Sequence, residues 1–454
     1  MTGSTTSWPD RLTDLVAEHG IVGASLAVLH RGEIVVEAAA GVTNLATGVE
    51  VTTDTLFQIG SITKVWVATV VMALVEEGVL DLDAPVVSVL PEVRLKTDEL
   101  TAGVTIRHLL SHTSGIDGDL FVDTGRGDDC LEKYVALLAD AAVIHPLGAT
   151  MSYCNAGYVL LGRVLEVVTG VQWDELMRER LFRPLGLTHT VTLPEEALLF
   201  RTAVGHDRQH DEPLKVVQRW GLMRSTGPAG LICSTPREVL TFAKLHLDGG
   251  TTADGIKILL PEHVTAMQRR QVGLPDQYRA TGWGLGWMLN EWDGTPVIGH
   301  DGATIGQNAF LSILPEHELA ICLVTNGGDV RAFRGAVFGE IAGALAGVTV
   351  KAPPTPATEP PPFDPADFVG TYEKAGTRIE IVENEGALSA VFTPSGELAD
   401  LSPDPETCEL RPLGPDAFVL RWPDESDWMS MTFYGLPDGS RCLYYALRSV
   451  PKVG

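Results

Sequence analysis

The chain has 454 residues, of which 45% are hydrophobic and 20% charged, a composition typical of a folded globular protein rather than a disordered one. This length exceeds what one ordinary hydrophobic core supports, so we expect two domains. The formal charge of −26 repels nucleic acid and anionic membrane surfaces, and no Lys/Arg-rich run offsets it, so nucleic acid is excluded as an expected partner.

The N-terminal segment and the cysteines bear on location and chemistry. Residues 1–10 have neither a basic n-region nor an apolar h-region, and no later segment offers about 18 uninterrupted apolar residues. We therefore expect a cytoplasmic protein with no membrane partner. The six cysteines are scattered, with no C-x-x-C pair and no histidine at metal-ligand spacing. We expect no metal and no other cofactor.

The chain begins with one helix and two strands. Residues 9–19 have the apolar spacing of an amphipathic helix. Residues 22–29 and 33–40 have the composition of strands, and His30-Arg31-Gly32 between them predicts a turn.

The next helix opens with a serine and a lysine. After Gly60 the apolar residues surround every face as far as Leu74, which is typical of a helix buried inside a domain, and Gly78 is a stop signal. Ser61 lies near the first turn, and Lys64 shares its face within hydrogen-bond reach of the hydroxyl. The first turn also offers unpaired N–H groups and the positive end of the helix dipole, which stabilise an anion. A nucleophile, a candidate base and an oxyanion site thus fall within four residues.

The middle of the chain is mainly helical. A short helix over residues 106–112 ends in a sharp turn, which His112 is expected to tie down. Asp117 to Asp129 is rich in Gly and Asp and predicts a long surface loop of the kind that rims a site. Thr235-Pro236-Arg237-Glu238 predicts a capping box with Pro at N1. Further helices are predicted over residues 130–142, 156–169, 173–181 and 236–247.

Strands predominate from residue 281 to residue 326. The pattern predicts them over residues 283–289, 295–299, 309–314 and 319–325. Strands at both ends of the domain with helices between them indicate one antiparallel sheet that both ends help to build.

A Pro-rich linker precedes a second domain. Residues 351–366 form a semi-rigid spacer because they are dense in proline. Beyond it, short alternating strands and a hairpin turn at Asp438-Gly439 indicate a small barrel or sandwich. We therefore predict a first domain over residues 1–350, a linker over 351–366 and a small β-barrel over 367–454.

Two further motifs join the serine and the lysine. Tyr153-Cys154-Asn155 precedes a predicted helix and is the only Y-x-N in the chain, and His300-Asp301-Gly302 follows the strand predicted over residues 295–299. The ordered set S-x-x-K, Y-x-N, H-x-G resembles the serine β-lactamase and penicillin-binding-protein superfamily, in particular its class C-like esterase and D-peptidase branch. The resemblance covers roughly residues 10–345. With its linker and β domain, the chain also resembles penicillin-binding-protein-type thioesterases, which release and cyclise nonribosomal peptides. It resembles plain peptidases with lipocalin-like tails as well.

The resemblance implies an α+β fold and an acyl-enzyme. The fold would be an antiparallel sheet flanked by helices with an all-helical subdomain, followed by a lipocalin-like barrel. Ser61 would be the nucleophile. Lys64 and Tyr153 would jointly accept its proton and pass one to the leaving group. A serine hydroxyl needs such a base because it is a weak nucleophile by itself.

The remaining motif residues would bind substrate. The resemblance implies that Asn155 holds a substrate amide and that the backbone N–H of Ala303, with that of Ser61, forms the oxyanion hole. His300 stands where the more familiar motif has lysine, with Gly302 two residues on. Each motif residue also has a structural alternative, as a helix cap, a turn residue or a strand-end histidine.

Three functions are open from the sequence. The first is a hydrolase, either an esterase or a D-amino-acid-specific peptidase. The second is an acyltransferase that offloads and macrocyclises a nonribosomal peptide with a D-residue at its acylating end, from a small-molecule or carrier-bound peptidyl thioester. We favour the second, as expected of an enzyme of antibiotic biosynthesis. The third, a non-enzymatic β-lactam sensor, is disfavoured because such sensors need a transmembrane partner.

Overall fold

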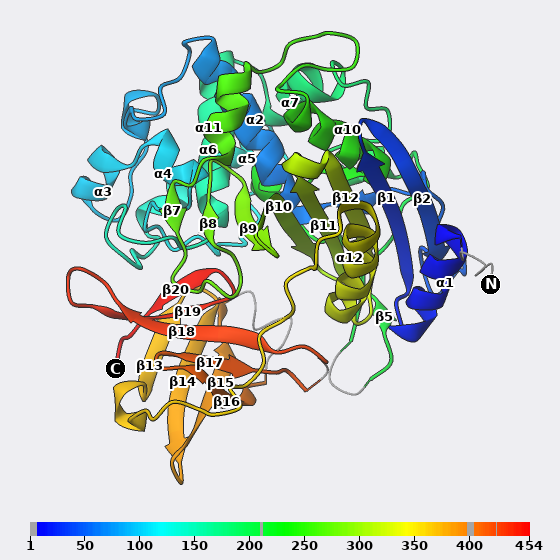
Figure 1. Ribbon diagram of the computed structural model, residues 1–454. Helices are drawn as coiled ribbons and strands as arrows, with labels where there is room; N and C mark the ends of the chain where they lie inside the picture. Colours follow the sequence, from blue (N-terminus) through cyan, green and yellow to red (C-terminus); the bar gives the residue numbers. More distant parts are fainter. Residues whose placement is uncertain (1–6, 209–211, 397–403, 424) are drawn as a thin grey trace, which may run out of the picture. The chain divides into compact units, whose positions relative to one another are not determined.

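The computed structural model describes residues 7–208, 212–396, 404–423 and 425–454 and divides the chain into two compact units (Figure 1). The first unit comprises residues 1–80, 169–269 and 286–351, and the second comprises residues 81–168, 270–285 and 352–454. The second unit thus joins a helical segment to the predicted β domain. The domain boundaries after residues 350 and 366 remain predictions. The N-terminal segment expected to lack a signal sequence lies partly outside the described residues.

An antiparallel sheet forms the centre of the first unit. β1 pairs with β12 from Ala24 opposite Thr325 to His30 opposite Leu319. Strands from the two ends of the predicted first domain therefore share one sheet, as predicted. Within this unit the strand order is β2 (Glu33–Gly41), β1 (Gly23–His30), β12 (Leu319–Thr325), β11 (Gln307–Leu314), β10 (Thr295–Thr304) and β9 (Met288–Trp292).

Helices cover both faces of this sheet. α1 (Trp8–Glu18) and α12 (Val330–Ala346) bury Leu12 and Phe338 against one face, while α10 (Pro236–Leu247) packs on β1 and β12 from the other (Figure 1). In α2 (Thr63–Glu76), every residue from Thr63 to Leu74 is buried, and the Trp66 ring stacks on Phe242 of α10 at 4.3 Å. Burial on all faces fixes α2, and with it the serine turn that precedes it.

The helical part of the second unit contains short elements and one long helix. The long helix is α6 (Asn155–Thr169), almost all of it buried up to Glu166. Around it lie α3 (Asp98–Gly103), α4 (Ile106–Leu110), α5 (Cys130–Ala136) and the hairpin of β7 (Val272–Gly273) with β8 (Gly282–Trp283). The loop from Asp117 to Asp129, predicted to lie at the surface, begins with a buried segment that includes Asp117.

An eight-stranded antiparallel barrel completes the second unit, which confirms the expected C-terminal β fold. Each strand pairs with the next, and the barrel is nearly closed by Thr371, whose N–H donates to the Gly454 carbonyl at 2.8 Å. Phe368, Phe418 and Phe433 form part of its core. The strands are β13 (Gly370–Lys374), β14 (Thr377–Asn384), β15 (Ala387–Pro394), β16 (Glu406–Gly414), β17 (Ala417–Leu420), β18 (Met429–Gly435), β19 (Arg441–Tyr445) and β20 (Arg448–Pro451).

Several predicted elements differ from those observed. The strand predicted over residues 283–289 is broken between β8 and β9, because Gly286 has φ +89° and leaves the extended conformation. After the predicted hairpin turn at Asp438-Gly439, β19 ends at Tyr445, because Ala446 and Leu447 both have positive φ and form a turn into β20. Glu238 does not complete a capping box with Thr235, since its carboxylate accepts from the His189 N–H at 2.8 Å. Helices α3, α11 (Pro261–Gln268) and α12 and strand β16 were not predicted.

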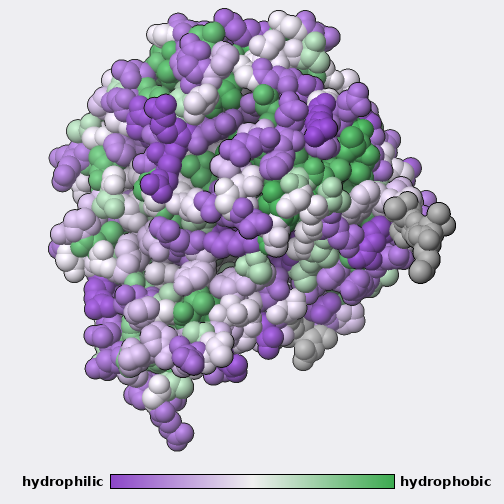
Figure 2. All heavy atoms as spheres, in the orientation of Figure 1, coloured by the Kyte–Doolittle hydropathy of each residue, from purple (hydrophilic) through white to green (hydrophobic). Residues whose placement is uncertain are grey.

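The described surface carries few large apolar groups. On the face shown in Figure 2, hydrophilic side chains predominate and hydrophobic ones form scattered patches. No helix within the described ranges has the length and apolar character needed to cross a bilayer.

Candidate active site

Ser61 and Lys64 lie where a 3₁₀ turn enters α2. The turn is Gly60–Ile62, and the Lys64 Nζ donates to the Ser61 Oγ at 3.0 Å and to the Ala229 carbonyl at 2.6 Å. Lys64 is fully buried, whereas Ser61 is partly exposed. The predicted nucleophile and the predicted base are thus in direct hydrogen-bond contact, the geometry that proton transfer from the hydroxyl requires.

Strand β10 passes directly beside the serine turn. A Cβ atom on Gly302 would lie 1.9 Å from the Ile59 carbonyl oxygen and 3.0 Å from the Ser61 nitrogen. One on Gly60, which has φ +51°, would lie 2.7 Å from the Ala303 nitrogen. Glycine at both positions permits this approach because it has no Cβ. The N–H groups predicted to form the oxyanion hole, those of Ser61 and Ala303, therefore lie at the same backbone contact.

His300 lies inside β10, opposite Leu311, and not after the end of a strand as predicted. The strand continues because β10 and β11 stay paired as far as Thr304 opposite Gln307. The ring is buried, and its Nδ1 lies 2.6 Å from the Asp301 carbonyl oxygen. Since a carbonyl oxygen can only accept, this contact assigns a proton to Nδ1.

Tyr153 lies in the second unit, in the loop before α6. Its N–H donates to the Leu447 carbonyl of the barrel at 2.8 Å, and the Arg448 guanidinium carbon lies 4.9 Å from the centre of its ring. On another side the Tyr153 ring packs on His112 at 4.4 Å between ring centres. Within the second unit, the helical part and the barrel therefore hold the same tyrosine.

His112 holds this loop through two hydrogen bonds. It has φ +58°, its Nδ1 accepts from the Cys154 N–H at 3.0 Å, and its carbonyl accepts from the Ser152 N–H at 2.9 Å. The expected structural role of His112 agrees with these bonds. Burial raises the pKa of the Cys154 thiol to about 12, so the thiolate is scarce at neutral pH and the side chain acts as packing.

Asp119 links Asn155 to two cations of the barrel. Its carboxylate accepts from the Asn155 Nδ2 at 2.9 Å, from the Lys374 Nζ at 2.7 Å and from the Arg448 Nε at 3.0 Å. Burial alone would raise the pKa of this carboxyl, but the charges of Arg448 and Lys374 and their hydrogen bonds hold it well below its usual range. Asp119 therefore stays ionised and orients the amide of Asn155. Beside it, Asp117 accepts from the Ala375 N–H at 2.5 Å.

Sequence reasoning missed this network. Asp119 lies in a Gly- and Asp-rich loop whose composition indicates a solvated surface, and its partner Arg448 is 329 residues away. Only the D-x-D spacing of Asp117 and Asp119 could have marked the loop. The structure thus brings Ser61, Lys64, Gly302 and Ala303 together in the first unit, with His300 on the same strand, and Tyr153 and Asn155 together in the second. That the two sets act on one substrate is part of the proposal below.

Comparison with known proteins identifies the family to which the chain belongs. The family model described as Beta-lactamase matches residues 9–344. Penicillin-binding protein 4 of Amycolatopsis lactamdurans is 45% identical over 372 residues, which cover 81% of this chain and 97% of that protein.

Solved structures agree with the family match and extend it to the barrel. The crystal structure of SurE superposes with a TM-score of 0.78 at 29% identity and covers 98% of this chain and 97% of that one. SurE has also been crystallised with D-Leu, with a TM-score of 0.75 at 28% identity. The D-amino acid amidase of Ochrobactrum anthropi, at 27% identity and a TM-score of 0.59, covers 70% of this chain and 89% of its own. The chain therefore belongs to the β-lactamase family and to the superfamily of serine hydrolases that includes the penicillin-binding proteins.

Proposed function

We propose that this protein is a serine acyltransferase that releases a nonribosomal peptide from a carrier-bound thioester and closes it head to tail, with a D-residue at the acylating end. The observation that carries the proposal is the match to SurE along the whole chain, barrel included, in contrast to the 70% coverage of the amidase. The barrel is therefore part of the architecture that this chain shares with SurE.

The first unit contains the nucleophile and the oxyanion donors proposed for the acylation step. The Ser61 hydroxyl attacks the thioester carbonyl, its proton passes to the Lys64 and Tyr153 pair, and the pair returns a proton to the departing thiolate. The oxyanion that forms accepts from the N–H groups of Ser61 and Ala303, which lie at one backbone contact. Removing a single donor of this kind typically costs about 10²–10³ in rate.

The second step is attack by the peptide's own amine. The neutral amine adds to the acyl carbonyl, loses a proton to the same pair, and expels the Ser61 oxygen, which takes that proton back. Folding the peptide onto its own ester raises the effective concentration of the amine to about 10⁵ M or more, against water at about 55 M. Asn155, held by Asp119, is proposed to bind a peptide amide of this folded substrate.

Two relatives support a D-configured acyl residue. SurE has been crystallised with D-Leu, and the similar protein from Ochrobactrum anthropi is named a D-amino acid amidase. The same amidase supports the alternative, in which water rather than an amine attacks the acyl-enzyme. Esterase EstB of Burkholderia gladioli, 30% identical over 310 residues, supports it too.

Incubation with linear peptidyl thioesters tests the choice. A thioester ending in a D-residue should give the cyclic product, one water lighter than the linear acid, and the L-terminated isomer should react far more slowly. The Ser61→Ala variant is the control for background cyclisation. If only linear acid forms, across several peptide lengths and both configurations, the protein is a hydrolase and the cyclase proposal fails.

A further inference from the structure

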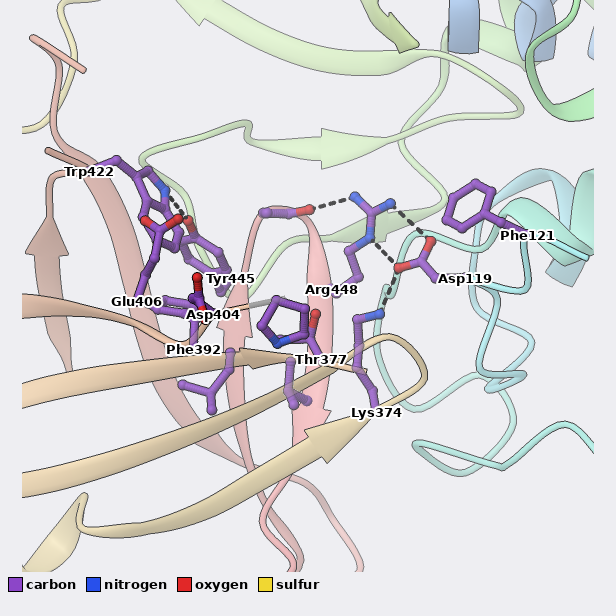
Figure 3. Close-up of a pocket in the computed structure, with 14 residues that line it drawn as sticks. Asp119, Phe121, Lys374, Thr377, Phe392, Asp404, Glu406, Trp422, Tyr445 and Arg448 are labelled. Carbon is purple, nitrogen blue, oxygen red and sulfur yellow. Dashed lines mark hydrogen bonds and ion pairs between the residues drawn. The ribbon is translucent and has the colours of Figure 1, made fainter. Parts of the chain in front are cut away.

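The second unit contains a cavity of about 380 Å³ that the catalytic proposal does not use. It opens in the barrel, and its volume falls within the range of small-ligand pockets, about 300–1,000 Å³. Figure 3 shows its two ends. Asp119, Lys374 and Arg448 lie at one end, and Trp422, Tyr445 and Glu406 lie at the other.

Three aromatic rings form an apolar wall. The Phe392 ring centre lies 4.7 Å from that of Trp422 and 5.3 Å from that of Tyr445. The Trp422 Nε1 donates to the Tyr445 hydroxyl at 3.0 Å, so the polar atoms of these two rings are engaged with one another. Ile379 and Val450 also line the cavity and add apolar surface. Such a wall suits an alkyl chain, and ring faces of this kind also attract a cation.

The charged side chains that line the cavity determine whether it favours a cation or an anion. The two cations that line the cavity, Lys374 and Arg448, are both bonded to Asp119. The other two lining carboxylates are those of Asp404 and Glu406. In the part of the chain that the structure describes, neither is in an ion pair. Asp119 therefore offsets one of the two positive charges at its end of the cavity, whereas the two carboxylates beside the aromatic rings offer a negative field.

Two lining side chains, Arg448 and Asp119, connect the cavity to the motif residues Tyr153 and Asn155. Arg448 lines the cavity, and its guanidinium carbon lies 4.9 Å from the centre of the Tyr153 ring. The same guanidinium bonds to Asp119, which holds Asn155. A group seated in the cavity is thus one side chain away from both motif residues.

We infer that this cavity is a subsite for an ammonium-bearing alkyl side chain, of the lysine or ornithine type, of the peptide on which the enzyme acts. The alkyl stem packs on Phe392, Trp422 and Tyr445, and the ammonium lies against Glu406 and Asp404. The identification of the ligand as a peptide side chain rests on the proposed function, whereas the preference of the cavity for an alkylammonium does not. Side chains of this type combine an apolar stem with a charged tip, which matches the two kinds of wall.

Binding of small probes to the full-length protein tests the inference without turnover. The probes are n-hexylammonium chloride, 1-hexanol and sodium hexanoate, titrated by calorimetry and followed by the fluorescence of Trp422, with Trp422→Phe as the blank. We expect saturable binding of hexylammonium, at least about tenfold tighter than hexanoate, because cation–π contact and the carboxylates both favour the cation. Equal affinity for hexanol and hexylammonium, or no saturable binding, would overturn the inference.

Variants on one strand locate the site. Glu406→Gln should weaken hexylammonium about tenfold and leave hexanol unchanged, since it removes charge and keeps the shape of the side chain. Glu409→Gln is the matched control, because Glu409 lies on the same strand, is exposed and pairs with Arg411. Asp404→Asn, at an exposed position, gives a second test should Glu406→Gln impair folding. Equal weakening by Glu409→Gln, or no effect of either cavity variant, would contradict the assignment.

The outcome separates this inference from the proposed function. All of these titrations can be run on Ser61→Ala protein. Hexylammonium binding with only linear acid produced from thioesters would remove the cyclase and keep the cavity as a cation subsite. Cyclisation without selective binding of hexylammonium would keep the cyclase and remove the cation subsite.

Discussion

The Asp119→Asn variant tests how the barrel supports the motif residues Tyr153 and Asn155. In the native protein the buried Asp119 carboxylate accepts from Asn155, Lys374 and Arg448 at 2.7 to 3.1 Å. The neutral amide leaves two cations without a charge partner, of which the Lys374 side chain is only 7% exposed. Breaking a buried pair in this way typically costs about 3–5 kcal/mol. Because the Arg448 side chain is 24% exposed and can regain water, we expect about 3 kcal/mol, near the lower bound.

Urea unfolding followed by tyrosine and tryptophan signals of the second unit measures this loss. Glu409→Gln is the control, since it breaks an exposed pair with Arg411 and should cost less than about 1 kcal/mol. Arg448→Met combined with Asp119→Asn should recover part of the loss, because it removes one of the unpaired cations. A loss below about 1 kcal/mol for Asp119→Asn, equal to the control, would refute the reasoning.

The low pKa of Asp119 predicts that its contribution to stability depends on pH. The folded pKa of Asp119 is lower than its unfolded pKa, so its contribution is fully present above the unfolded pKa of about 3.9 and is lost as pH falls toward the folded pKa. The stability difference between native protein and Asp119→Asn should therefore be constant near neutrality and shrink below about pH 4. Asp276 contributes to the pH dependence of stability with the opposite sign. Burial raises its pKa, so its ionisation opposes folding as pH rises.

Three further predictions concern the motif residues and the barrel. Gly302→Ala should lower kcat by about 10²-fold or more, because its Cβ would lie 1.9 Å from the Ile59 carbonyl and force β10 away from Ser61; unchanged turnover would exclude a role for this contact. Lys64→Ala and Tyr153→Phe should each cost about 10³-fold in kcat/KM with the fold retained by circular dichroism, and near-normal rates would place the base elsewhere. Deletion of residues 352–454 should reduce turnover of small esters and of long peptides alike, because it removes the Leu447 carbonyl that holds Tyr153; a loss confined to peptides would indicate a lid instead.

Local patterns predicted much of this structure. The buried helix after Ser61 follows from an unbroken apolar run, and the sheet that closes through β1 and β12 follows from strands at both ends of one domain. The hydrogen bond between Lys64 and Ser61 follows from their three-residue spacing. In each case the prediction rests on the residue pattern of single helices and strands.

Contacts between distant segments could not be predicted in the same way. His300 was predicted to follow a strand that ends at residue 299, whereas pairing with β11 keeps the segment extended. Asp119 looked solvated because its partners Lys374 and Arg448 come from the barrel. The turn at Ala446 and Leu447 has no glycine to mark its positive φ values.

Covalent acylation of Ser61 tests the central claim most directly. Intact-mass measurement after brief incubation with a peptidyl thioester ending in a D-residue should show one adduct, heavier by the mass of the acyl group. Ser61→Ala should show none, and digestion should place the adduct on the peptide that contains Ser61. An adduct that persists in Ser61→Ala, or turnover by that variant at the native rate, would contradict the assignment of Ser61 as the nucleophile.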